Sequence, residues 1–173
     1  MNILAVDATG DVLSVALGRF ELKRAAKKHD EALLPLVERL LKKAGLGWKD
    51  LDAIAAAAGP GRFTGIRVGM SFAAAAGFQL KIPALAISRL AAAAGRSRAV
   101  RVLGALPGWK DEVYSQEYRR GKAAGAASWT APEDWPGFRG AAEARGYAVY
   151  YRETTAADLL PVAPGQLAAQ KHP

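Results

Sequence analysis

Cysteine is absent from this chain of 173 residues. Its absence excludes disulfide bonds, thiolate metal sites and a cysteine nucleophile, and it is consistent with a reducing compartment. Histidine is scarce as well, because His29 and His172 are the only two, too few for a histidine-rich metal site. We therefore expect a cytoplasmic protein without a bound metal or cofactor. Residues 2–6 have the pattern of a strand, which predicts that no signal peptide precedes the fold.

Acidic residues are missing from one long segment. No Asp or Glu occurs in residues 53–110, whereas eight Lys and Arg residues do. The net charge of +8 arises there, because the remainder holds sixteen residues of each sign. A stretch of one sign attracts polyanions, nucleic acid above all, although a merely solvated basic surface is the alternative. The eight cations are Arg62, Arg67, Lys81, Arg89, Arg96, Arg98, Arg101 and Lys110.

The most informative stretch begins with the apolar run 51–58, which predicts a buried strand. The glycine–proline–glycine segment 59–61 predicts a tight turn, and a helical pattern that begins at residue 62 or 64 follows it to Leu80. We expect no membrane span here, because Arg67 and several glycines interrupt the run and about 20 apolar residues are needed. Nearly every side of this helix is apolar, so its own core or a partner must cover more than one side.

Small residues form one stripe along this helix. Gly65, Gly69, Ala73, Ala76 and Gly77 fall at i, i+4, i+8, i+11 and i+12. Such a stripe lets another backbone approach closely, although each interior glycine costs roughly 1 kcal/mol of helix stability relative to alanine. Two interpretations remain open: tight packing of the helix on its own sheet, or a helix–helix interface with a second chain.

Two nucleotide-binding motifs do not fit the glycine-rich turn. A Walker loop needs lysine where Ile66 stands, and the glycines of segment 59–65 have the wrong spacing for a dinucleotide fingerprint. A third interpretation is that the amides at the helix start hold an anion. Thr9, Arg62 and Arg67 are the candidate anion-binding residues.

Two successive hairpin-plus-helix patterns predict an α/β protein with a duplicated actin/Hsp70-like (ASKHA) fold. We expect a first lobe over residues 1–97 and a smaller, reduced second lobe over residues 98–173. The expected strands are 3–6, 12–17, 20–26, 51–58, 84–87, 100–106, 112–118 and 147–151. The expected helices are 30–43, capped by Asp30, then 62–80, 88–94, 132–145 with an interruption near Pro136, and one turn at 166–170.

The first expected hairpin, with Asp7 and Thr9 at its turn, occupies the position of the hairpin that binds phosphate in this fold. An active member also needs a carboxylate at the matching turn of the second lobe, because a metal–phosphate group requires carboxylates on both sides. The corresponding turn, residues 106–109, has no acidic residue before Asp111. We therefore expect half of an ATP-hydrolysing site to be missing and no residue to be catalytic.

The segment GPGRFTGIRVG at residues 59–69 is a long and specific motif. Through this motif above all, the chain resembles the TsaB (YeaZ) family, which belongs to the bacterial machinery that makes threonylcarbamoyladenosine in tRNA. Family members usually carry serine where Arg62 stands and a different turn where residues 107–109 stand, and they generally continue beyond residue 173. The other matching segments are 3–7, 14–17, His29 with 34–35, 112–114 and 159–161.

The resemblance implies a non-catalytic scaffold or activating subunit for threonylcarbamoyl transfer to the adenosine next to the tRNA anticodon. It further implies pairing with the catalytic subunit TsaD through the two apolar helices, work alongside the ATPase TsaE, and contact with tRNA that is weak or indirect. A homodimer of the isolated chain is a further expectation. The expected interface residues are Leu33, Val37, Leu40, Phe63, Gly65, Ile66, Gly69, Met70, Ala73 and Ala76.

Two other functions are alternatives. The first is a small-molecule kinase or ATPase of the same fold that uses Asp7 and Thr9. The second is a nucleic-acid-binding module that depends on the basic stretch. If four arginines of that stretch face one surface, we expect them to strengthen the binding of tRNA by the assembled complex. These four are Arg89, Arg96, Arg98 and Arg101.

Overall fold

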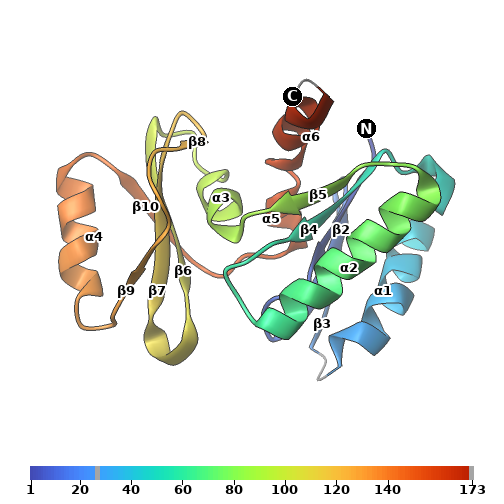
Figure 1. The fold of residues 1–173 in the computed structure, drawn as a ribbon, viewed down its shortest axis with the longest axis horizontal. Helices are drawn as coiled ribbons and strands as arrows, with labels where there is room; N and C mark the ends of the chain where they lie inside the picture. The colour runs from blue at the N-terminus through green and yellow to red at the C-terminus, as the bar shows by residue number, and fades with distance from the viewer. Residues whose placement is uncertain (26–27, 172–173) are drawn as a thin grey trace. The chain divides into compact units, whose positions relative to one another are not determined.

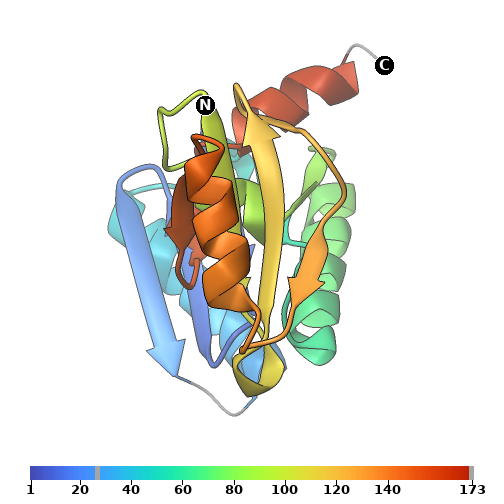
Figure 2. The same ribbon diagram turned by 90° about the vertical axis from the view of Figure 1, so that its left-hand side faces the viewer.

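The computed structural model describes residues 1–25 and 28–171, and it divides the chain into two compact units (Figures 1 and 2). One unit comprises Met1–Ile87 together with Thr155–Pro173, and the other comprises Ser88–Thr154. We call them the first and the second unit. This division differs from the expected lobes 1–97 and 98–173 in two respects. The short helix at 89–94 packs on strands of the second unit, and the C-terminal helices pack on the first.

The first unit contains a five-stranded sheet in the order β3-β2-β1-β4-β5. The first three strands are antiparallel neighbours, whereas β4 and β5 run parallel to β1. Every residue of β1 and β4 is buried, which agrees with their nearly continuous apolar sequences. The strands are β1 (Ile3–Asp7), β2 (Val12–Leu17), β3 (Phe20–Ala25), β4 (Ala53–Ala57) and β5 (Ala84–Ile87). Ala26, which we expected at the end of β3, lies outside the described residues.

Two long helices, α1 (His29–Ala44) and α2 (Phe63–Leu80), pack side by side on this sheet and share one core with it (Figure 1). The short helix η1 (Trp48–Asp50) precedes β4. Two C-terminal helices complete the unit: α5 (Ala156–Leu159) contacts β1, β2 and β4, and α6 (Ala163–Lys171) contacts β5.

The second unit contains a sheet in the order β10-β6-β7-β8, with the short strand β9 also paired to β7. Residues that alternate along β6 lie on opposite faces. Val102 and Leu106 pack with α3, whereas Leu103 packs with Ala142 of α4, the helix that Figure 2 shows in front of the sheet. The elements are α3 (Arg89–Ala94), β6 (Arg101–Pro107), η2 (Trp109–Asp111), β7 (Val113–Arg119), β8 (Lys122–Ala123), β9 (Ser128–Thr130), α4 (Trp135–Ala144) and β10 (Ala148–Tyr151).

The second unit repeats the topology of the first in shortened form. The run β1-β2-β3-α1-β4 places β4 parallel to β1, and the run β6-β7-β8-α4-β10 likewise places β10 parallel to β6. Within the described residues the second unit has no counterpart of α2 and β5 after β10. The fold is therefore a duplicated actin/Hsp70-like α/β fold with a reduced second half, as the sequence predicts.

Two local predictions were wrong. Asp30 does not cap α1, because the helix begins one residue earlier with Lys28 as its N-cap, and Asp30 lies in the first turn, where negative charge favours the helix dipole. Pro136 does not interrupt α4. It occupies the first turn, where its missing N–H has no helical partner to lose. No described helix has the length and apolarity that crossing a membrane requires.

Candidate functional site

The glycine-rich turn before α2 lies against the turn between β1 and β2. The amide of Arg62 donates to the carbonyl oxygen of Thr9 at 2.9 Å. At Gly61, an added Cβ would lie 2.7 Å from the Cβ of Thr9. At Gly65, an added Cβ would overlap the carbonyl oxygen of Ala8 and lie 2.8 Å from its carbonyl carbon. Glycine at these two positions therefore permits the close approach of two backbones.

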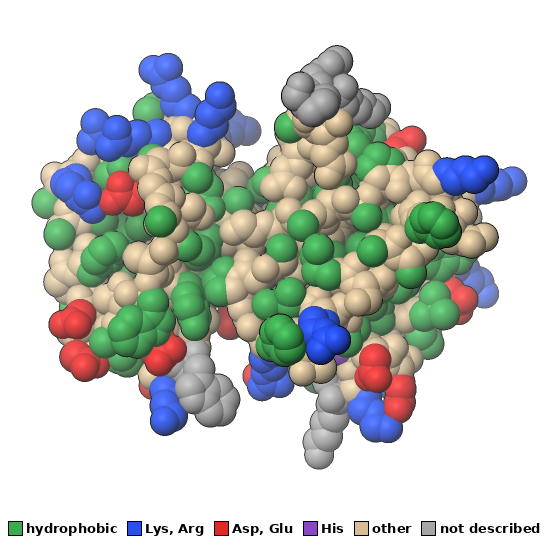
Figure 3. Space-filling view, in the orientation of Figure 1, with side chains coloured by type: hydrophobic (Ala, Val, Ile, Leu, Met, Phe, Trp, Pro, Cys, Tyr) green, Lys and Arg blue, Asp and Glu red, His purple; other side chains and the backbone are tan. Residues whose placement is uncertain are grey.

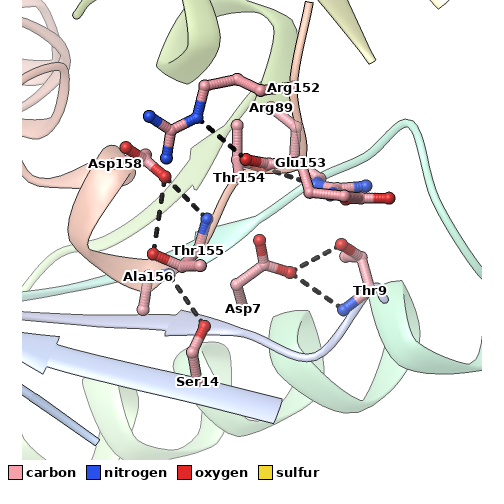
Figure 4. A network of polar contacts seen from close by, with 10 residues as sticks. All are labelled: Asp7, Thr9, Ser14, Arg89, Arg152, Glu153, Thr154, Thr155, Ala156 and Asp158. Atoms are coloured by element: carbon pink, nitrogen blue, oxygen red, sulfur yellow. Dashed lines mark hydrogen bonds and ion pairs between the residues drawn. The ribbon is translucent and has the colours of Figure 1, made fainter. Parts of the chain in front are cut away.

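The β1–β2 turn is stabilised by its own polar side chains (Figure 4). Asp7 and Thr9 are both almost fully buried. The amide of Thr9 donates to Oδ1 of Asp7 at 2.9 Å, and its hydroxyl donates to the same oxygen at 2.6 Å. Nδ1 of His29 lies 2.9 Å from the carbonyl oxygen of Ala8, so in the tautomer that carries a proton there it donates to that oxygen. These contacts assign Thr9 and His29 a structural role at the turn.

We expect Thr9→Ala to lower the free energy of unfolding by about 1–2 kcal/mol, because the variant loses the buried hydrogen bond to Asp7. Thr9→Ser retains the hydroxyl and serves as the control. Urea denaturation followed by circular dichroism measures the effect. A Thr9→Ala variant of normal stability that binds its partner or a ligand poorly would instead make Thr9 a ligand-binding residue.

An open cavity of about 980 Å³ lies beside this turn in the first unit. Among the three candidate anion-binding residues, Arg62 lines it and forms an ion pair with the exposed Asp11. Thr9 belongs to the turn and is buried, and the guanidinium of Arg67 lies over the ring of Phe63, 5.4 Å from its centre. The structure thus does not gather the three residues into one site. Lys28 and His29 also line the cavity, and sequence reasoning did not select them because they belong to another helix.

The small-residue stripe of α2 packs on the chain's own sheet. Its buried residues are Gly65, Gly69, Ala73 and Gly77, and Ala73 belongs to the core shared with β1, β2 and β4. Gly69 stands opposite Val6 and Ala56, to which an added Cβ would lie 3.9 Å away. Of the two interpretations of the stripe, packing on the sheet is therefore the one that the structure shows.

Six of the ten expected interface residues are buried within the first unit. Three of them belong to α1 and three to α2, and all six contribute to packing on the sheet. The six are Leu33, Val37, Leu40, Gly65, Gly69 and Ala73. The other four remain accessible: Ile66, Met70 and Ala76 are half-buried, and Phe63 is 72% exposed.

A different side of α2 faces outward and carries large apolar side chains. Phe63 and Phe78 are 72% and 87% exposed. They are separated by about four turns and lie on one side of the helix together with exposed Arg67, Ser71 and Ala74. We call these five residues, with half-buried Met70, the outer α2 face. Apolar side chains exposed over α2 are visible in Figure 3. Exposed rings of this size at both ends of one helix face are typical of a protein interface.

Comparison with known proteins agrees with this fold and sequence. Residues 23–132 match the family model described as "TsaD: tRNA N6-adenosine threonylcarbamoyltransferase". The chain is 34% identical over 131 residues to the tRNA threonylcarbamoyladenosine biosynthesis protein TsaB of Escherichia coli (strain K12). The aligned segment covers 69% of this chain and 56% of that protein. Over 66 residues the chain is 47% identical to the tRNA N6-adenosine threonylcarbamoyltransferase of Nitrosospira multiformis, covering 38% of this chain and 19% of that protein.

A solved structure extends the similarity over nearly the whole chain. The structure of YeaZ from Pseudomonas aeruginosa superposes with a TM-score of 0.75 and 30% sequence identity, covering 98% of this chain and 93% of that one. The chain thus has an actin/Hsp70-like fold, and it belongs to the TsaB (YeaZ) family. It spans about half the length of the curated TsaB relatives that it matches, 56% in the case of the Escherichia coli protein.

Proposed function

We propose that this chain is a non-catalytic activating subunit in the biosynthesis of threonylcarbamoyladenosine in tRNA, and that it acts by pairing with a TsaD-like transferase. The observation that carries the proposal is the outer α2 face, which exposes Phe63 and Phe78 on the helix that follows the most specific family motif. The names of the similar proteins supply the pathway.

Similarity to the transferase itself supports the mode of pairing. A segment of 66 residues is 47% identical to a TsaD-type protein, so the two kinds of chain are related in sequence over 38% of this chain. Related surfaces can meet about a pseudo-twofold axis, in which each presents the same helix face to the other. We assign the outer α2 face to this contact, together with half-buried Ile66, which lies one turn before Met70. When the partner is absent, the same face pairs two copies of this chain.

The hydrogen bonds of Asp7 support a non-catalytic role over the kinase or ATPase alternative. One carboxylate oxygen of Asp7 accepts both the amide and the hydroxyl of Thr9, so that oxygen serves the turn. Catalysis then resides in the TsaD-like partner, with a TsaE-like ATPase alongside.

The test is reconstitution with the TsaD-like and TsaE-like proteins of the same organism. We expect the purified chain alone neither to hydrolyse ATP nor to modify tRNA, and we expect tRNA modification to require the chain in the full mixture. Nucleoside mass spectrometry and phosphate release measure the two activities. Mg²⁺-dependent ATP turnover by the chain alone that disappears in Asp7→Asn would contradict the proposal and favour the kinase or ATPase.

A further inference from the structure

Positive charge is concentrated at one end of the second unit, at the edge where β6 begins and β7 ends. We call the cations there the basic end. All of them are exposed, and Figure 3 shows Lys and Arg side chains gathered at the upper end of this unit. The basic end comprises Arg96, Arg98, Arg101, Arg119, Arg120, Lys122 and Arg145.

The strand register places three of these cations in one row. Arg119 of β7 stands directly opposite Arg101 of β6 on one side and Lys122 of β8 on the other. Adjacent strands lie about 5 Å apart, so the row spans roughly 10 Å. Like charges directly opposite each other in a sheet destabilise it. The three cations in this row therefore repel one another and destabilise the sheet locally. Such a cost is expected where the charges bind an anion outside the chain.

Backbone contacts bring the remaining cations to the same end. The amide of Arg120 donates to the carbonyl oxygen of Val100 at 2.8 Å, which joins the loop that carries Arg96 and Arg98 to the β7–β8 turn. On the other side of the row, Nη1 of Arg101 donates to the carbonyl oxygen of Arg145 at 2.8 Å. The seven cations therefore form one surface, although they come from three separate stretches of the sequence.

Tyr147 holds two of the guanidinium groups in place. Its hydroxyl accepts a hydrogen bond from Nε of Arg119 at 3.1 Å, and the guanidinium of Arg145 lies over its ring, 5.4 Å from the ring centre. A buried tyrosine that orients two arginines reduces the conformational entropy that they lose on binding an anion. Within the described part of the chain, Arg98, Arg120 and Lys122 make no ion pair.

Acidic residues of this unit neutralise little of the basic end. Glu117 forms an ion pair with Arg145 at 2.7 Å, and a hydrogen bond from Tyr147 lowers its pKa, so it remains charged at neutral pH. Glu143 forms an ion pair with Arg139, which lies outside the basic end. Four further acids occur next to the opposite ends of β6 and β7, and acidic side chains are visible there in Figure 3. These four are Asp111, Glu112, Glu133 and Asp134.

We propose that the basic end is a docking surface for the sugar–phosphate backbone of tRNA; this inference rests on the proposed function for the identity of the nucleic acid. Six of its seven cations are arginines, whose planar guanidinium groups bind phosphate oxygens bidentately. The surface includes one large exposed apolar side chain, Val100, which is too little for insertion into a membrane. A cationic row spread over three strands and two loops matches the repeated charges of a polynucleotide.

The residues of this surface differ from the set of four arginines that we expected from the sequence. Arg89 does not belong to it, because its side chain is 3% exposed, donates to Oγ1 of Thr154 at 2.8 Å and forms an ion pair with Glu153 (Figure 4). Arg119, Arg120, Lys122 and Arg145 belong to it, although they lie outside the acid-free stretch.

The test compares two variants of equal charge. The basic-end variant carries Arg98→Gln, Arg120→Gln and Lys122→Gln, and the control carries Lys42→Gln, Lys49→Gln and Lys81→Gln at exposed positions of the first unit. Fluorescence anisotropy of a labelled tRNA transcript measures affinity for the full chain between about 50 and 200 mM salt. For the basic-end variant we expect about tenfold weaker binding and a slope of log K against log salt that is shallower by about 2 to 3. The control should retain wild-type affinity and slope.

Three outcomes would overturn the inference: unchanged binding in the basic-end variant, an equal loss in both variants, or labelled poly-glutamate that binds as tightly as tRNA. The first two would mean that binding follows other sites or net charge, and the third would mean a general polyanion surface. Because the isolated chain is used, the result is separate from the proposed function. A chain that binds tRNA through its basic end but never associates with a TsaD-like protein would refute the proposed function alone.

Discussion

Gly65→Ala is expected to destabilise the first unit by about 3 kcal/mol or more. The added Cβ would overlap the carbonyl oxygen of Ala8, would lie 2.8 Å from the carbonyl carbon of that residue and 3.1 Å from the Cα of Thr9. All three are backbone atoms, so no side-chain rotation relieves the overlap. Either α2 or the β1–β2 turn must move, and the hydrogen bond from the Arg62 amide to Thr9 would be strained with it.

Gly69→Ala is the matched control for this substitution. It lies one turn further along the same buried side of α2, but its added Cβ would meet Val6 and Ala56 at 3.9 Å, an ordinary contact. Alanine also favours helix over glycine by about 1 kcal/mol, so this variant should be as stable as the wild type or slightly more so. Urea denaturation of both variants measures the difference. Equal stabilities would show that α2 does not approach the β1–β2 turn as closely as described.

The two glycines show which part of the site the sequence could predict. The break at 59–61 and the helix to Leu80 follow from local patterns, and the structure has a bend at residues 60–61 followed by α2 to Leu80. The side of α2 that faces the sheet could not be assigned, because apolar residues occur on nearly every side. What decides it is the carbonyl oxygen of Ala8, about 57 positions away in sequence from Gly65, against which only glycine fits.

The cations of the basic end could likewise be predicted from the sequence only in part. Sequence reasoning found the acid-free stretch, and three of its arginines, Arg96, Arg98 and Arg101, do lie on one surface. It could not add Arg119 or Lys122, since they reach that surface only through strand pairing. Nor could it exclude Arg89, because burial of a charged side chain depends on partners such as Thr154 that lie 65 residues away.

Two neighbouring alanines of α2 should respond in opposite ways to glutamate. Ala73 is 2% exposed and belongs to the core of the first unit, whereas Ala74 is exposed on the outer α2 face. Ala73→Glu would bury a carboxylate without a partner, which costs about 3–5 kcal/mol, and we expect it to unfold the chain or to lower its melting temperature strongly. Ala74→Glu should fold with a melting temperature close to that of the wild type.

Association with the TsaD-like partner should fall about a hundredfold in Ala74→Glu. An unpaired carboxylate buried at the centre of the contact would cost about 3 kcal/mol, and each 1.4 kcal/mol is about tenfold in affinity. Ala141→Glu adds the same side chain to an exposed position of α4 in the second unit and should pair normally. Circular dichroism and light scattering on the same samples measure folding and association. A folded Ala74→Glu variant that pairs as tightly as Ala141→Glu would remove the outer α2 face from the interface, and a folded Ala73→Glu variant would contradict the burial of the small-residue stripe.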